Sequence, residues 1–505
     1  MTTTLSATVT LDPDFHRGTI DRRLFGSFLE HMGRAVYHGV YEPDHPTADE
    51  FGFRRDVQDL IAELGTTLVR YPGGNFVSGY DWTHGIGPVA DRPRDLELAW
   101  HSIETNEVGT DEFLRWADRT AIEPMMAVNL GTAGIAEAVA LLEYTNLPTG
   151  TRWADRRSAN GHPDPYGVPL WCLGNEMDGP WQTGHLSAAE YGSLADRVGR
   201  AMKSADPTIE LVAVGSSSHQ MATYATWEQT VLESCFDVHH LSLHAYYAET
   251  GGDRRSFLAS GADMDAFIKE VVSIADAVAG RRRSRKRIGL SFDEWNVCYH
   301  VPGEQRERWE IAAPRGENDY SALDAVVVGD LLVTLLNNSD RVPIACFAQL
   351  VNTIAPIMTE NAADGGASWR QTTFHPIALT AAAARGHSLQ AAVRAPVLDT
   401  ARHGEVPLVS AAATHDPETG RVTVFCVNRG EEPVRLSLRH HGFGSFAADS
   451  ATTLRADDAG ARRGAAATAE AAPVALTGFT TDGATSTVEL PPESWTMLGA
   501  ASSPL

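Results

Sequence analysis

The sequence has few cysteines, no long apolar run and a shortage of positive charge. Its five cysteines are widely spaced and include no Cys-x-x-Cys pair, which argues against a zinc knuckle or a disulfide framework. No stretch approaches the roughly 18 uninterrupted apolar residues of a membrane span. The first residues, MTTTLSATVTLDPDF, lack the basic and apolar segments of a secretory signal. We therefore predict a cytoplasmic protein that does not enter a membrane.

The charge balance restricts the kinds of partner. The chain has 65 acidic and 41 basic residues and a formal net charge of -24. A nucleic-acid-binding protein needs a basic surface, so this class is disfavoured, as is attraction to an anionic membrane or a polyanionic substrate. We expect a small neutral molecule as the partner, and neither a metal ion nor another cofactor.

Short apolar runs alternate with amphipathic helical runs between residues 20 and 388. Runs that are apolar throughout indicate strands buried on both faces. Eight of them alternating with helices predict an α/β protein with a closed (β/α)8 TIM barrel. An open doubly wound sheet is the alternative, but no glycine-rich phosphate-binding fingerprint follows the first run. The predicted strands are 24–30, 66–72, 124–130, 169–175, 209–215, 240–246, 288–294 and 344–350.

The pattern changes after residue 388. Runs such as RVTVFCVNR and STVELPPESW alternate apolar and polar residues at period two, which predicts an antiparallel β-sandwich, jelly-roll-like, over 389–505. The segment LSATVTLD near the start alternates in the same way, so we expect residues 1–19 to join this sandwich as a strand. The catalytic barrel then spans 20–388. The sandwich strands lack a clustered aromatic platform, so a structural and assembly role is favoured over carbohydrate binding.

Polar and aromatic side chains crowd the ends of the predicted barrel strands. Catalytic groups of such barrels lie at the carboxyl ends of the strands. Hydroxyl-binding amides, carboxylates and aromatic rings together suit a neutral, polyhydroxylated ligand. The residues at these ends are Glu30, His31, Asn75, Asn129, Asn175, Glu176, His244, Tyr246, Asp293, Glu294 and Gln349.

Glu176 and Glu294 end the fourth and seventh strands, roughly opposite each other in the barrel. Glycoside hydrolysis needs one carboxyl group that donates a proton and one that attacks or activates water. A gap of about 5–5.5 Å gives retention and about 6.5–9.5 Å gives inversion, so the sequence leaves this choice open. Metal catalysis through His244 is disfavoured, because the adjacent His239 and His240 point to opposite faces of a strand and at most one of them could join it.

Four long motifs carry a resemblance to a known family. They are GSFLEHMGRAVYHGVYEP, RYPGGNFVSGYDW, WCLGNEMDGPWQTGH and SFDEWNVCYH. Together they strongly resemble the intracellular α-L-arabinofuranosidases of glycoside hydrolase family 51, in clan A, over nearly the whole barrel and more weakly in the sandwich. The resemblance implies retaining hydrolysis of terminal non-reducing α-L-arabinofuranosyl residues from arabinan and arabinoxylan fragments. It also implies a homohexamer in which the sandwich shares in assembly.

The resemblance also implies roles for individual residues. Glu176 is expected to be the general acid/base and Glu294 the nucleophile. Many relatives have an aromatic residue at the position of Cys298, so the leaving-group preference stays open. A β-xylosidase or endoglucanase of the same clan, or a sugar-binding protein without activity, is the alternative. The expected substrate-binding residues are Glu30, Asn75, Asn175, Tyr246 and Gln349, with His244 and Trp100 as further pocket positions.

Overall fold

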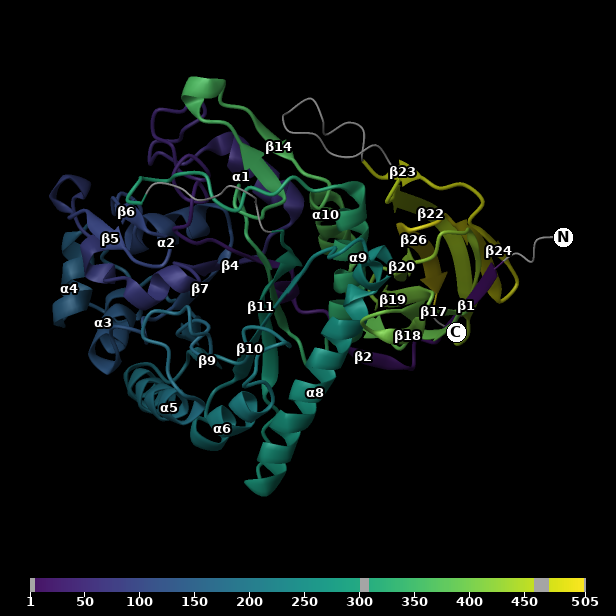
Figure 1. Ribbon diagram of the computed structural model, residues 1–505, viewed down its shortest axis with the longest axis horizontal. Coiled ribbons are helices and arrows are strands. Elements are labelled where there is room, and N and C mark those ends of the chain that lie inside the picture. Colours follow the sequence, from purple (N-terminus) through teal and green to yellow (C-terminus); the bar gives the residue numbers. More distant parts are fainter. Residues whose placement is uncertain (1–4, 300–307, 458–471, 504–505) are drawn as a thin grey trace.

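Two units lie side by side in the protein, a barrel ringed by helices and a layered β-structure (Figure 1). The computed structural model describes residues 5–299, 308–457 and 472–503 of the 505-residue chain. None of the helices in these ranges is both long enough and apolar enough to cross a bilayer.

Eight parallel strands close into a barrel, which confirms the predicted (β/α)8 fold. Each predicted run overlaps one barrel strand, and most strands are shorter than predicted. For example, Leu24 and Phe25 belong to a 3-10 turn, η1 (Arg22–Phe25), and not to the first strand. The strands are β3 (Gly26–Phe28), β4 (Leu68–Tyr71), β7 (Glu123–Ala127), β8 (Leu170–Leu173), β9 (Glu210–Ala213), β10 (His240–Tyr247), β11 (Gly289–Val297) and β12 (Ile344–Ala348).

Amphipathic helices surround the barrel and begin where the sequence supplies a cap. Ser187 and Ser321 each accept a backbone N–H three residues on and are bonded in return by Glu190 and Asp324, which forms a capping box. The helices are α1 (Arg55–Leu64), α2 (Thr110–Arg119), α3 (Ile135–Asn146), α4 (Arg152–Ala159), α5 (Ala188–Ala205), α6 (Thr226–Ser234), α7 (Arg254–Leu258), α8 (Ser260–Arg281), α9 (Ala322–Asn337) and α10 (Phe374–Ala383).

The second unit is a sandwich of a five-stranded and a seven-stranded sheet, in which most strand pairs are antiparallel. Its described strands include β15 (His387–Leu389), β16 (Ala392–Arg394), β19 (Val409–Asp416), β20 (Arg421–Asn428), β21 (Val434–His440), β22 (Ser445–Arg455), β25 (Thr485–Leu490) and β26 (Ser494–Ser503). Shorter strands are β17 (Val397–Thr400), β18 (Gly404–Pro407), β23 (Val474–Ala475) and β24 (Thr480–Asp482).

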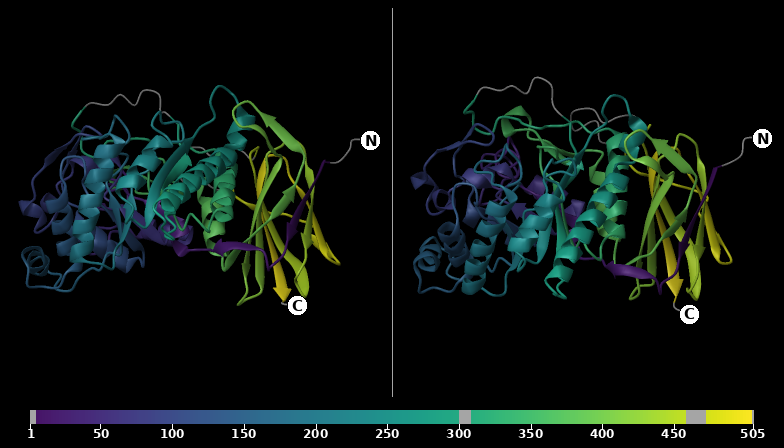
Figure 2. Two further views of the ribbon diagram at one scale, coloured as in Figure 1. Left: turned by 90° about the horizontal axis from the view of Figure 1, so that it is seen from below. Right: turned by 60° about the horizontal axis from the view of Figure 1, so that its bottom comes forward.

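The N-terminal segment joins this sandwich, as predicted. Strand β1 (Leu5–Leu11) lies between β16 and β21, antiparallel to the first and parallel to the second. Strand β2 (His16–Thr19) pairs with β15 in the other sheet. In Figure 2 the purple N-terminal strand lies among the strands of the yellow end of the chain. The chain therefore enters the barrel only after contributing to both sheets of the sandwich.

Helix α9 joins the two units. All residues from Ala322 to Leu336 are buried, because the helix packs on α8 and α10 and also on sandwich strands β19, β20, β22 and β26. Gly329 lets the Trp495 indole of β26 approach, since a methyl group at Gly329 would lie 2.2 Å from Trp495 Cδ1. Asp330 accepts from Arg429 Nη2 at 2.8 Å in a buried ion pair across the same interface.

Candidate active site

The two glutamates lie together at the carboxyl end of the barrel. Glu176 follows β8 and Glu294 lies within β11, and the intervening strands are β9 and β10. One carboxylate oxygen of each glutamate lies within 4.8 Å of the other. This approach suits the retaining geometry, in which the two carboxyl groups lie about 5–5.5 Å apart. Glu176 also has a φ of 42°, a strained conformation of the kind that concentrates at functional sites.

Two donors hold the carboxylate of Glu294. Arg70 Nη1 donates to Oε1 at 2.8 Å, and the Tyr246 hydroxyl donates to Oε2 at 2.7 Å. Burial raises the pKa of Glu294, while the charges of His244 and Arg70 oppose the rise. Both oxygens are therefore fixed in direction, and the neighbouring cations favour the ionised form.

His244 is a cation enclosed by carboxylates. It contacts Glu294 at 3.6 Å, Asp293 at 3.3 Å and Glu176 at 2.9 Å. Burial lowers the pKa of His244, but the three carboxylates outweigh this effect and raise the pKa to about 10. The imidazolium therefore donates to Glu176 at neutral pH. Register supports this placement, because His244 pairs with Glu294 across β10 and β11.

The ligand atoms of Glu176, His244 and Glu294 are close enough together to hold a metal ion. A protonated imidazole has no lone pair with which to bind a metal ion. With His244 protonated, the three residues therefore form a hydrogen-bonded acid–base cluster and not a metal site. The other two histidines lie at the opposite end of β10. His240 pairs there with Glu210, and His239 accepts from the backbone of Leu211.

Arg70 and Trp181 contact the central residues, and sequence reasoning assigned a role to neither. Arg70 also donates to Asn175 Oδ1 at 2.6 Å, and Asn175 Nδ2 in turn donates to Asn75 at 3.3 Å. Trp181, although 52% exposed, donates from its indole to Glu176 Oε2 at 2.7 Å. A charged residue inside the apolar run TTLVRYP was the available signal for Arg70.

A second group of predicted residues surrounds Glu30. The Phe76 backbone and the Trp100 indole donate to Oε1 at 2.9 and 3.0 Å, and Gln349 donates to Oε2 at 3.3 Å. Burial raises the pKa of Glu30 to about 8, assisted by the charge of Glu294 and opposed by the two donors to Oε1. Phe76 follows Asn75 in the turn η2 (Asn75–Gly79), so this group adjoins the Asn175 group.

Two other positions from the sequence have different surroundings. Asn129 lies two residues beyond β7 and donates to Tyr80 O and Thr132 Oγ1, so it stabilises a loop and contacts neither glutamate. Cys298 is partly exposed just beyond β11, where its backbone N–H donates to Tyr247 O at 2.8 Å. All nine predicted catalytic and substrate-binding residues lie in the two adjoining groups, whereas Asn129 does not.

A (β/α)8 barrel with two opposed carboxylates on its fourth and seventh strands defines a glycoside hydrolase. The comparisons with known proteins identify the family. The chain matches the α-L-arabinofuranosidase 1 domain over residues 60–256 and the α-L-arabinofuranosidase C-terminal domain over residues 293–494. It belongs to the α-L-arabinofuranosidases of glycoside hydrolase family 51, which confirms the resemblance seen in the sequence.

Individual relatives match over most of their length. An intracellular exo-α-(1→5)-L-arabinofuranosidase of Halalkalibacterium halodurans is 52% identical over 88% of this chain and 89% of its own. An exo-α-(1→6)-L-arabinofuranosidase of Bifidobacterium longum is 49% identical over 96% and 95%. A solved family 51 α-L-arabinofuranosidase from Bifidobacterium longum superposes with a TM-score of 0.93 at 45% identity, covering 98% of this chain and 100% of that one.

Proposed function

We propose that the protein removes terminal non-reducing α-L-arabinofuranosyl residues from arabino-oligosaccharides, such as arabinan and arabinoxylan fragments, with retention of configuration. The observation that carries the reaction type is the approach of Glu176 and Glu294 to within 4.8 Å. Family membership supports the sugar. The proposed reaction uses no cofactor.

The first step forms a covalent intermediate. A Glu294 oxygen attacks the anomeric carbon, and the bond from that carbon to the leaving oxygen breaks as Glu176 gives its proton to that oxygen. In the second step Glu176 takes a proton from water, the water oxygen bonds to the anomeric carbon, and the ester to Glu294 breaks. The enzyme returns to its starting protonation state.

The cations of the site suit both steps. Arg70 and His244 match the charges of Asp293 and Glu294, so the resting site is balanced when Glu176 holds its proton. When Glu294 becomes an ester, one negative charge is lost there and one appears on Glu176. His244 and Trp181 donate to the two oxygens of Glu176, and these donors stabilise the new carboxylate.

The remaining predicted residues are proposed to bind the sugar. Asn175 is held by Arg70 so that its amide nitrogen faces Asn75, beside the nucleophile. Glu30, Trp100 and Gln349 form a hydrogen-bonded group that adjoins it. Amide and carboxyl groups that are held in fixed directions can form hydrogen bonds with several hydroxyl groups of one sugar ring.

Removal of each carboxylate tests the mechanism. Glu294→Ala should be almost inactive, and azide should restore turnover with an inverted glycosyl azide as product. Glu176→Ala should keep activity on substrates whose leaving group needs no proton, such as nitrophenyl arabinofuranosides. If azide yields no glycosyl azide with Glu294→Ala, another group is the nucleophile.

The sugar and the linkage need separate tests. A panel of nitrophenyl glycosides distinguishes an arabinofuranosidase from a β-xylosidase or an endoglucanase, and binding of arabinose without any turnover would indicate a sugar-binding protein. Relatives are named for (1→5) and for (1→6) linkages. Rates on arabino-oligosaccharides of defined linkage therefore show which linkage this chain prefers.

We also propose that the protein is a cytoplasmic homohexamer. Support for the location is the word intracellular in the names of several relatives. Support for assembly is the exposure of Phe15 and Val397, at 61% and 60%, on or beside the sandwich. Light scattering should give a mass of about six times the 54.5 kDa chain, and a monomeric mass would contradict the proposal.

A further inference from the structure

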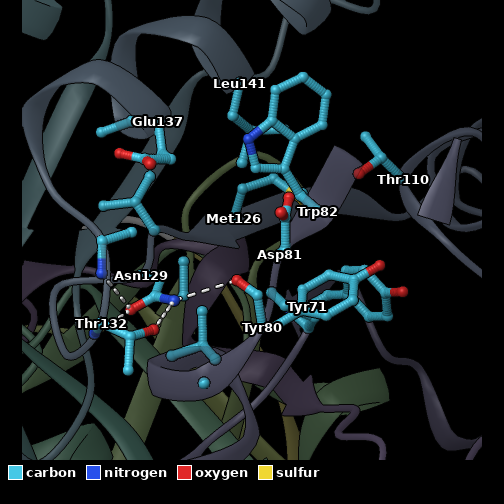
Figure 3. A pocket seen from close by; sticks show the side chains of 17 residues that line it. Tyr71, Tyr80, Asp81, Trp82, Thr110, Met126, Asn129, Thr132, Glu137 and Leu141 are labelled. Carbon is cyan, nitrogen blue, oxygen red and sulfur yellow. Dashed lines mark hydrogen bonds between the residues drawn. The ribbon is translucent and has the colours of Figure 1, made fainter. Parts of the chain in front are cut away.

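A second cavity lies beside the active site, behind the turn that carries Asn75. Its volume is about 140 Å³, and it is bounded by the loops after β4 and β7 together with the first turns of α2 and α3. Figure 3 shows Trp82, Leu141 and Met126 on one side and Asn129 and Thr132 on the other. Its lining residues include neither Glu176 nor Glu294.

The lining combines aromatic walls with unused polar groups. Trp82 is 6% exposed and forms one wall with Leu141, while Tyr80 is a second aromatic wall. Thr110 is 1% exposed, and the buried Tyr80 hydroxyl and Trp82 indole N–H make no hydrogen bond with any part of the chain that the structure describes. In Figure 3 the Thr110 hydroxyl faces Trp82. Buried polar groups without a partner, such as those of Tyr80 and Trp82, are unfavourable unless a ligand or water bonds to them.

The charges and the size of the cavity restrict its occupant. Asp81 and Glu137 are exposed at its edge, and the residues that line it include no lysine, arginine or histidine. An anionic ligand is therefore disfavoured. A cavity of about 150 Å³ accommodates a single six-membered ring. Glu137 makes no hydrogen bond or ion pair with the described residues. Its carboxylate is therefore available to accept a hydrogen bond from a hydroxyl group of a ligand.

We propose that this cavity binds one neutral sugar ring of pentose size, separately from the ring at the catalytic glutamates. The aromatic walls would contact the apolar face of the ring, and Thr110 and Glu137 would bond its hydroxyls. The ring could be a free monosaccharide or one unit of an oligosaccharide, because both present the same chemistry. This site goes beyond the proposed function and does not depend on the roles of Glu176 and Glu294.

The turn η2 connects the two sites. Val77 and Gly79 line the cavity, whereas Asn75 and Phe76 face the active-site groups. Thr132 donates to Ser78 O from both its backbone and its hydroxyl, at 3.1 and 3.0 Å. A ring held in the cavity would therefore press on the segment that positions Asn75. Occupancy should alter turnover as well as substrate affinity.

Inhibition kinetics and crystallography together test the site. With a nitrophenyl arabinofuranoside as substrate, L-arabinose should lower kcat and raise KM of the wild type. Ala138→Phe fills the cavity, because Ala138 is buried in its wall, and should leave inhibition that only raises KM. Ala136→Phe is the matched control on the exposed side of α3 and should behave as the wild type. Uninhibited kcat/KM should stay within about twofold in both variants.

Further measurements keep the test decisive if Ala138→Phe folds poorly. Thr110→Val keeps the shape of the side chain and should weaken the effect of L-arabinose on kcat about fivefold through the lost hydrogen bond. Crystals of the wild type soaked in L-arabinose should show a ring against Trp82, and crystals of Glu294→Ala with arabinotriose show whether a chain reaches the same place. Purely competitive inhibition of the wild type, together with no ring against Trp82 in the crystals, would overturn the proposal. Crystals in which phenol binds against Trp82 but no sugar does would also overturn it.

Discussion

Among single residues, His244 has the least usual environment, since three carboxylates surround a buried imidazolium. Its charge lowers the pKa of Glu294, and a neutral side chain in its place would let that pKa rise. We predict that His244→Gln moves the acid limb of the kcat/KM profile upward by about 1–3 pH units, the range expected for one close opposite charge.

The same substitution at His219 is the control for this prediction. His219 also lies between two carboxylates, Asp263 and Glu270, but forms no ion pair with Glu176 or Glu294. His219→Gln should leave the acid limb in place. An unshifted profile for His244→Gln would show that the charge of His244 does not act on the ionising group.

Glu30 makes stability depend on pH. Its folded pKa of about 8 lies above the ordinary 4.5, so the native protein holds a proton that the unfolded chain releases. Stability from this group is therefore present below pH 4.5 and is lost as the pH rises to about 8. Between pH 6 and 8 the loss corresponds to about 2–3 °C in melting temperature for a chain of this size.

Calorimetry at pH 6 and pH 8 checks this prediction. Glu30→Gln should show a smaller fall in melting temperature than the wild type. His244 contributes a fall of the same sign above its ordinary pKa of 6.5, and it is present in both proteins. Glu137→Gln changes an exposed carboxylate and should melt as the wild type at both pH values. An equal fall in all three would contradict the assigned cause.

Some residues of the site could be predicted from the sequence, and others could not. Glu176, Glu294 and Gln349 could be predicted because each follows or ends an apolar run, and position in a barrel determines which strand ends face the ligand. Trp181 could not, because its bond to Glu176 depends on the path of a loop. Arg70 could not either, because a charge in a buried strand is explained only by the partners that neutralise it.

Helix α9 has no polar face, because neighbouring elements bury it on all sides. Two units cover it, and Gly329 is the point of closest approach. We predict that Gly329→Ala destabilises the protein by about 1–3 kcal/mol, because the added methyl group must displace the buried Trp495. Thermal or urea unfolding measures the change.

Gly280 supplies a matched control for this substitution. It lies near the end of α8, and a methyl group there would meet no atom within 4 Å. Gly280→Ala should stabilise by about 0.5–1 kcal/mol, since alanine loses less conformational freedom in a helix. If both substitutions have the same sign, the contact between α9 and Trp495 does not explain the need for glycine.

The presence of each barrel strand was easier to predict than its first and last residues. Eight apolar runs gave eight barrel strands, since burial on both faces leaves a strong pattern. The ends differed because strand pairing, and not apolar character, decides where a strand stops. Leu24 and Phe25 are buried without being in the first strand. The partners of β1 could not be predicted, because nothing local to 5–11 specifies pairing with residues 434–440.

For the whole molecule, one large hydrophobic cluster extends from the barrel into the sandwich, whose interior also has a cluster of its own. Phe425, Leu454 and Trp495 of the sandwich belong to the same packed cluster as the barrel residues. We predict that a chain ending at residue 388 is insoluble, because it would expose one side of α9. The full chain should unfold in one calorimetric transition. A soluble, active barrel fragment or two separate transitions would contradict this.

The pairing of β1 has a consequence for how the protein is made. Its first strand emerges from the ribosome before any of the barrel, yet its neighbour β21 is synthesised more than 400 residues later. Domains commonly fold one after another from the amino end during synthesis. Here this segment must wait, without its partner, until residues 434–440 have been released. Chaperones that hold nascent chains should therefore bind this segment before the barrel emerges and release it only after β21 has been made.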